Sequence, residues 1–229
     1  MSVHRLDGNP PIDVSIRKSA RAKRLSLRVS QLDGRVTLTI PSRSPLREGI
    51  SFLQEREIWL RTHLIRLAPE AIVQAGGALP YQGVDLPVVA GAVKRTALRD
   101  GVLHVPDAAT AGAKARAFLK LRARDELAIA SDHYARQLGV TYNRLSIRDT
   151  RSRWGSCSSD GVLMYSWRLI MAPPEILRYV AAHEAAHLVE MNHSDRFWAV
   201  VARICPDYDA HRVWLKENGG RLHRVNFGD

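Results

Sequence analysis

The feature that most constrains this chain is the segment VAAHEAAHLVEMNH, which spans residues 180–193. It places three of the nine histidines of the chain, together with two glutamates, among mostly apolar residues. A helix with this pattern is expected to be buried on nearly all sides. Buried imidazole and carboxylate groups are costly unless they are paired or bind a metal ion. The segment therefore requires a fold that encloses a helix and supplies partners for its polar side chains.

His183 and His187 lie four residues apart, and Glu184 directly follows the first of them. Side chains four residues apart project from one face of a helix, so the two imidazoles can bind one metal ion. Glu184 lies about 100° around the helix, where its carboxylate can reach a water molecule at the metal and act as a general base. The pattern H-E-x-x-H is a signature of zinc metalloproteases. The alternative is a core helix with two satisfied histidines and a surface glutamate between them.

A third metal ligand is needed, because catalytic zinc usually has three protein ligands. His193 can be that ligand only if the helix ends before it, and Asn192 is a residue that favours a left-handed C-terminal position. The separation of His183 and His193 by ten residues equals the first-to-third spacing of the metzincin motif, which favours His193. The rival ligands are the acidic residues Glu190, Asp207 and Asp209.

The segment RSRWGSCSSDGVLMYSWRLIMAPPEILRYVAAHEAAHLVEMNHSDRFWAVVARICPDYDAHRVWL closely resembles the YgjP-like metallopeptidases, a family akin to the SprT-like proteases. The strand-rich start of the chain is also similar to the N-terminal half of that family. The resemblance implies a zincin-type fold, one Zn²⁺ ion bound by the three histidines, and Glu184 as the catalytic base. Two positions differ from the expected pattern: Ala185, where leucine is more usual, and Ser166, where asparagine is.

The reaction that follows from these expectations is hydrolysis of a peptide or protein substrate. Zinc polarises the scissile carbonyl, and Glu184 transfers the proton of the attacking water to the leaving amine. The hairpin that precedes the helix is similar to the edge strand that zincins place along the cleft, onto which an extended peptide can add. Trp154, Gly155, Ser156 and Cys157 are therefore candidate substrate-binding residues, and the alternative for Trp154 is packing at a turn.

The rest of the pattern predicts an α+β fold. Alternating apolar and polar residues in IDVSIRK, LSLRVS and RVTLTIP, with a turn at Asp33-Gly34, predict a small antiparallel meander. Helical spacing predicts one helix near residues 45–68 and a long helix over residues 107–139 that ends at Gly139. The apolar stripe expected on the long helix consists of Phe118, Leu121, Leu127, Ala130 and Leu138.

We expect two domains from this arrangement. Residues 1–106 form a β-rich N-terminal region with one helix, and residues 107–229 form a zincin-like α/β metallopeptidase domain with an active-site helix. No apolar run approaches the roughly 18 residues of a membrane-spanning helix, and no apolar leader is present. Cys157 and Cys205 provide no disulfide framework. We therefore expect a cytoplasmic protein without a membrane partner. The oligomeric state does not follow from the sequence.

The formal net charge is +11, and the densest basic run is RKSARAKRLSLRV. Arg21, Lys23 and Arg24 in this run are candidate contacts for DNA or RNA, because neutralised phosphates release counterions. A solvated strand-and-turn surface is the more common explanation of such a run. The alternative function is thus a nucleic-acid-associated protein, and the SprT kinship together with the charge suggests a protease of DNA-bound proteins.

Overall fold

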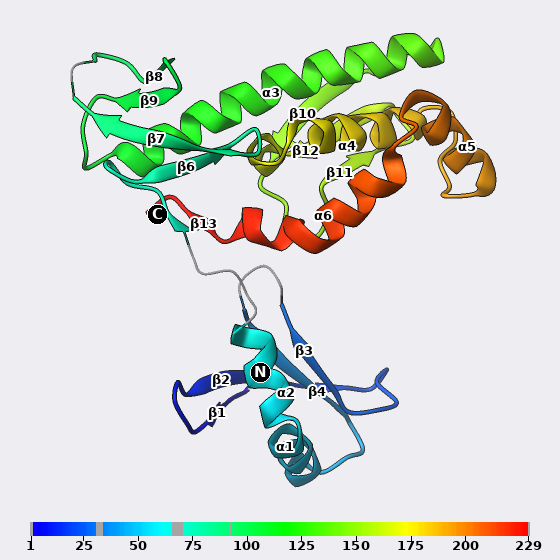
Figure 1. The fold of residues 1–229 in the computed structure, drawn as a ribbon. Helices are drawn as coiled ribbons and strands as arrows, with labels where there is room; N and C mark the ends of the chain where they lie inside the picture. Colours follow the sequence, from blue (N-terminus) through cyan, green and yellow to red (C-terminus); the bar gives the residue numbers. More distant parts are fainter. Residues whose placement is uncertain (1, 31–33, 66–70, 92, 229) are drawn as a thin grey trace. The chain divides into compact units, whose positions relative to one another are not determined.

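The chain folds into two compact units, residues 1–69 and residues 70–229, which we call the N-terminal unit and the C-terminal unit. The structure is a computed structural model that describes residues 2–30, 34–65, 71–91 and 93–228 (Figure 1). Helices and several small sheets together make up the molecule, which confirms the predicted α+β class. None of the described helices combines the length and the apolar character needed to cross a membrane.

The N-terminal unit contains a four-stranded sheet. Its strands are β1 (Ser2–Leu6), β2 (Ile12–Ser19), β3 (Ser26–Val29) and β4 (Val36–Pro41), in the order β1-β2-β4-β3. β3 and β4 are antiparallel, as the predicted hairpin requires, although Asp33 of its turn lies outside the described residues. β2 and β4 are parallel, so the predicted three-stranded antiparallel meander is wrong. The link of residues 20–25 is long enough for β3 to lie on the far side of β4, and local turn signals do not reveal that choice of partner.

Two helices cover one face of this sheet: α1 (Leu46–Glu55) packs against β4, and α2 (Glu57–Ile65) packs against β3. The predicted single helix is interrupted at Arg56, where the backbone leaves the helical region. Leu53 and Leu60 are fully buried on either side of the break, whereas Ile58 is 83% exposed. The apolar residues of the strands alternate with polar ones and face these helices, which forms a separate small core.

The C-terminal unit begins with strands that pack on the long helix α3 (Ala111–Leu138). These strands are β6 (Ala78–Tyr81), β7 (Val84–Ala90), β8 (Ala97–Arg99) and β9 (Val102–Val105), in the order β6-β7-β9-β8. A short pair joins β5 (Ala71–Ile72) to β13 (Val225–Asn226). Because these strands share one core with α3, the compact units divide near residue 70, whereas the sequence suggested a boundary at residues 106 and 107.

The long helix α3 ends at Gly139, which has a φ of 68° in the left-handed region, as the sequence predicted. Its buried stripe differs from the prediction, since Leu121 is 60% exposed. Leu127 is buried as predicted, and the buried side follows a spacing of four in which alanine and leucine both occur: Ala111, Ala115, Leu119, Ala123 and Leu127. Alanine at these positions allows the neighbouring elements to approach the helix closely.

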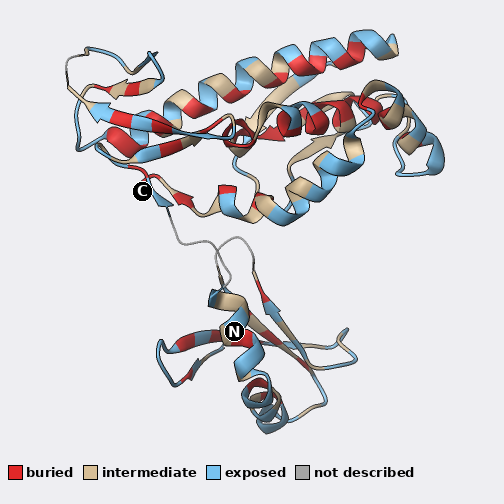
Figure 2. Cartoon of the chain, viewed as in Figure 1, coloured by how far each residue is buried: buried red, intermediate tan, exposed pale blue. Residues whose placement is uncertain are grey.

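The remaining elements surround the histidine-rich segment. A three-stranded sheet of order β10-β12-β11 contains β10 (Arg144–Arg148), β11 (Gly155–Cys157) and β12 (Val162–Ser166). The short helix η1 (Trp167–Met171) leads into α4 (Pro174–Ala186), which begins at a proline as predicted. The chain ends with α5 (Asp195–Ile204), α6 (Tyr208–His223) and β13. Most of α4 is buried (Figure 2), as its apolar sequence requires.

Candidate metal centre

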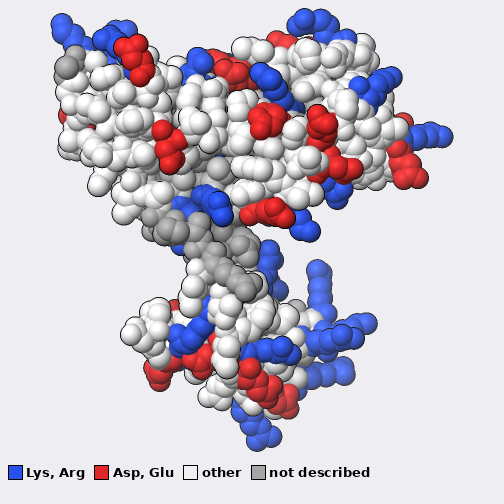
Figure 3. Space-filling view, in the orientation of Figure 1, with Lys and Arg blue, Asp and Glu red and all other residues white. Residues whose placement is uncertain are grey.

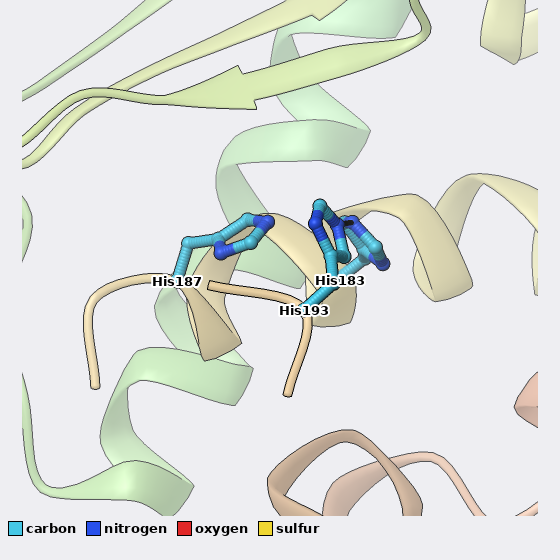
Figure 4. Close-up of side chains that lie close together, drawn as sticks. All are labelled: His183, His187 and His193. Carbon is cyan, nitrogen blue, oxygen red and sulfur yellow. Dashed lines mark hydrogen bonds between the residues drawn. The ribbon is translucent and has the colours of Figure 1, made fainter. Parts of the chain in front are cut away.

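Three histidine side chains converge at the C-terminal end of α4. Potential ligand nitrogens of His183, His187 and His193 all lie within 4.8 Å of one another. The Nε2 atoms of His183 and His193 are 3.0 Å apart, and the three rings gather around one point (Figure 4). His183 lies in α4, His187 is the residue that caps the C-terminal end of this helix, and His193 lies in the loop between α4 and α5. Three imidazoles in this arrangement can bind a single metal ion.

The helix ends early enough to bring His193 to the other two histidines. α4 stops at Ala186, and backbone hydrogen bonds from Leu188 N to Ala185 O and from Glu190 N to Ala186 O form the turn that follows. The expected left-handed conformation of Asn192 is wrong, because the positive φ angles of described non-glycine residues occur elsewhere. The turn immediately after Ala186 reverses the chain without a left-handed residue.

The ring of His187 is oriented by the backbone. Its Nδ1 lies 3.0 Å from the carbonyl oxygen of Glu190, so Nδ1–H can donate to that oxygen and leave the lone pair of Nε2 for a metal. Glu190, a rival ligand in the sequence analysis, thus contributes its main-chain carbonyl. Within the described ranges, the metal-ligand cluster consists of the three histidines and includes neither Asp207 nor Asp209.

Aromatic side chains from α5 pack under the histidines. Phe197 is fully buried, and its ring stacks on that of His187 with centroids 4.3 Å apart. The ring of Trp198 lies 5.8 Å from that of His183 and stacks on Tyr208 at 5.3 Å. These rings limit the rotation of the imidazoles and exclude water from one side of the site. The segment HSDRFW, which follows the H-E-x-x-H motif, predicts that Phe197 and Trp198 pack beneath the site, and the structure confirms this packing.

Burial favours the neutral forms of His183 and His187. Burial, followed by the neighbouring imidazoles of His187 and His193, lowers the pKa of His183 to about 3. The pKa of His187 is also lowered, with burial as the largest cause. A metal ion binds the neutral form of imidazole, so these groups do not have to lose a proton at neutral pH. Nδ1 of His183 is buried and has no hydrogen-bond partner among the described residues.

Glu184 lies beside the histidines and is 5% exposed. Burial raises the pKa of its carboxyl group to about 8, and the positive charge of Arg153 opposes the rise. Within the part of the chain that the structure describes, this carboxyl group has no hydrogen bond or ion pair. It lies against Gly155 of β11, where a Cβ atom would come within 2.5 Å of Oε1 of Glu184. Only glycine at position 155 leaves space for the carboxylate.

A cavity of about 210 Å³ lies between β11 and the histidines. Its lining includes Met191, which the sequence analysis missed, and the following residues: Gly155, Ser156, Cys157, His183, Glu184, His187 and His193. Three of the four predicted substrate-binding residues therefore lie at the cavity. Trp154 instead packs on α6, with its ring 4.7 Å from that of His223 and so close to Gly219 that a Cβ there would clash.

One edge of β11, on the side opposite to β12, pairs with no other described strand. β11 is the outer strand of its sheet and pairs only with β12 among the described strands. Ser166 N donates to Trp154 O at 2.8 Å, and Ser158 N donates to Val162 O at 3.1 Å. The alternation of an antiparallel ladder then turns the N–H and C=O groups of Gly155 and Cys157 toward the free edge. This edge can accept another extended chain.

The basic residues Arg21, Lys23 and Arg24 are exposed in the loop between β2 and β3. They belong to the N-terminal unit, whereas the histidines, Glu184 and the cavity belong to the C-terminal unit. The candidate nucleic-acid residues and the candidate metal centre are thus separate features of the chain.

The histidine cluster at the end of a buried helix is typical of metal-dependent hydrolases of the H-E-x-x-H class. A family model described as YgjP-like, metallopeptidase domain, matches residues 23–218, which is most of the chain. The chain therefore belongs to the YgjP-like metallopeptidase family. Searches among curated proteins and among solved structures give no match.

Proposed function

We propose that this protein is a zinc-dependent metallopeptidase that hydrolyses peptide bonds at the centre formed by His183, His187 and His193. The observation that carries the proposal is the convergence of three imidazoles beside a buried carboxyl group that has no hydrogen-bond partner among the described residues. Three histidines are a known ligand set of catalytic zinc, and two nitrogens bound to one tetrahedral zinc lie about 3.4 Å apart. The separation of 3.0 Å between the Nε2 atoms of His183 and His193 fits such a shared ion.

Glu184 is the proposed general base. When bound, zinc supplies a Lewis acid that polarises a carbonyl oxygen and makes a water molecule more acidic. The carboxylate of Glu184 accepts a proton from the attacking water and returns it to the nitrogen of the leaving amine. A carboxyl group whose pKa is raised to about 8 can both accept and return a proton near neutral pH. Because Gly155 has no side chain, it leaves the space that this carboxyl group occupies.

The substrate is an extended peptide that adds to the free edge of β11. Main-chain hydrogen bonds to Gly155 and Cys157 hold the peptide, while its side chains alternate between the cavity and solvent. The binding energy then comes mainly from the backbone, so the site requires an unfolded or flexible segment of the substrate. Met191, which is 48% exposed at the cavity, provides an adaptable apolar contact.

The test combines zinc content with peptide cleavage. We expect one equivalent of zinc in the wild-type protein and in Glu184→Gln, measured by elemental analysis after dialysis. Cleavage of a fluorogenic peptide library should fall by about 10²–10⁴-fold in Glu184→Gln, because a general base contributes a factor of this size. Glu175→Gln is the matched control, since Glu175 is an exposed glutamate in the first turn of the same helix.

Two results would contradict the proposal. Full activity of Glu184→Gln would show that Glu184 is not the general base. Wild-type protein that holds no zinc after exposure to the metal would show that the three histidines do not form a zinc site. Equal loss of activity in Glu175→Gln would show that the effect is a general one on α4.

A further inference from the structure

One face of the sheet in the N-terminal unit is polar and is not covered by α1 or α2. The core residues of β4, such as Leu38 and Ile40, point toward the helices, so Thr37 and Thr39 point to the opposite face. Strand register adds neighbours on the same face, since Ser15 pairs with Thr37 and Arg17 with Thr39. On the other side, Arg28 pairs with Thr37 and Ser26 with Thr39. We call these six residues the open face: Ser15, Arg17, Ser26, Arg28, Thr37 and Thr39.

Within the described part of the chain, the side chains of the open face are not engaged in polar interactions. None of its four hydroxyl groups and neither of its guanidinium groups makes a hydrogen bond or ion pair with a residue in the described ranges. Arg17 and Arg28 are exposed, and the two threonines lie between them in the sheet. All six side chains can donate hydrogen bonds. At the edge of the face, the pairing of Arg5 with Asp13 places opposite charges on neighbouring strands.

Further positive charge follows directly along the chain. The loop after β2 carries Arg21, Lys23 and Arg24, all exposed. Residues 1–69 contain 13 Lys and Arg against 6 Asp and Glu, a net charge of +7, whereas the longer segment 70–229 contains 21 against 17, a net charge of +4. Lys and Arg side chains project from one flank of the N-terminal unit in Figure 3. An acidic partner is therefore attracted to this unit more than to the other.

We propose that the open face and the loop of residues 20–25, which links β2 to β3, bind the sugar–phosphate backbone of double-stranded nucleic acid. Arginine, lysine, serine and threonine are the side chains that contact phosphates, and such contacts do not depend on the base sequence. The open face contains no aromatic side chain on which an unpaired base can stack, which favours a duplex over a single strand. The surface is spread over three strands, so that several phosphates can be contacted at once. The proposal does not depend on the peptidase chemistry of the C-terminal unit.

The test measures binding of the full-length protein to labelled 20-base-pair duplexes of mixed sequence, made of DNA or of RNA, by fluorescence anisotropy at several salt concentrations. In Arg17→Gln/Arg28→Gln, we expect affinity to fall at least tenfold and the slope of log affinity against log salt to decrease by about 1.8, or about 0.9 for each lost phosphate contact. Preference for DNA or RNA identifies which duplex is the ligand.

A matched control separates specific contacts from net charge. Arg124→Gln/Arg136→Gln removes the same charge from exposed positions of α3 in the C-terminal unit and should leave the affinity and the salt slope nearly unchanged. Thr37→Val/Thr39→Val removes two hydroxyl donors without changing charge, and should weaken binding several-fold at an unchanged slope.

Three results would overturn the proposal. The first is an equal loss in the two arginine double variants, which would reduce the effect to net charge. The second is tighter binding of single strands than of duplexes. The third is binding to vesicles that contain anionic lipid with no binding to either duplex. Circular dichroism of each variant tests whether the fold is retained, because the four arginines are exposed but Thr37 and Thr39 are half-buried.

Discussion

The two units of this protein differ in whether their polar side chains are buried or exposed. In the C-terminal unit, Glu184 and His187 are buried in an apolar environment, and burial shifts the pKa of each away from its ordinary value. Among the described residues of the N-terminal unit, every buried side chain in the core is apolar, and the charged groups lie at the surface. Chemistry on a substrate requires desolvated groups whose proton affinity can be tuned, whereas binding of a polyanion requires exposed donors. The difference predicts where substitutions act.

The largest expected effect is loss of the metal. His183→Ala removes one of the three proposed zinc ligands, so zinc affinity should fall by about 10²–10⁴-fold and peptide cleavage should be lost. The control is His133→Ala, which removes an exposed histidine of α3. Competition with a zinc chelator of known affinity measures the change. Unchanged affinity in His183→Ala would mean that the imidazoles are only a buried cluster.

A smaller loss of peptide cleavage is expected from a substitution at the contact between β11 and α4. In Gly155→Ala, the new Cβ comes within 2.5 Å of Oε1 of Glu184, so the carboxylate has to move. A misplacement of about 1 Å lowers kcat about 10²-fold, and zinc content should not change. Ser159→Ala, in the turn of the same hairpin, is the control. Simultaneous loss of zinc and activity would instead indicate that the whole cleft has been distorted.

The local chemistry of the site could be predicted from sequence, because it depends on spacing along one helix. The start of α4 at Pro174 and the i,i+4 pair of histidines follow from local rules, and the position of His193 near them requires only that the helix ends early. The mode of that ending was not predictable: Asn192 is not left-handed, because hydrogen bonds to Ala185 and Ala186 already turn the chain.

Features that depend on contacts distant in sequence could not be predicted. The parallel pairing of β2 with β4 depends on which strand occupies the centre of the sheet. For Trp154 the sequence left open a rim position or packing at a turn, and its actual packing partners, Gly219 and His223 of α6, lie far along the chain. Leu121 fits an apolar stripe by its type, yet the side of α3 that packs against the neighbouring elements is the one that carries Ala115, Leu119 and Ala123. In each case the decisive neighbour lies outside the local pattern.

The smallest effect on peptide cleavage is expected from a change in the core of the N-terminal unit. Leu38 is fully buried there, and Leu38→Ala should lower the free energy of unfolding of this unit by about 2–5 kcal/mol. Because its core is separate from that of the C-terminal unit, zinc content and cleavage rate should stay within about twofold of the wild type, while binding of duplex nucleic acid weakens near the melting temperature of the variant.

The matched change in the other unit is Leu127→Ala, which removes a fully buried side chain of α3 from the core that supports the metal centre. It should lower the thermal transition that releases zinc and leave the transition of the N-terminal unit in place. Calorimetry with a zinc-sensitive dye resolves the two transitions. If Leu38→Ala and Leu127→Ala shift one common transition and release zinc together, the units unfold as one, and the separation of a desolvated catalytic unit from an exposed binding unit fails. Two independent transitions would mean that a substitution of polar residues in one unit leaves the stability of the other unit unchanged.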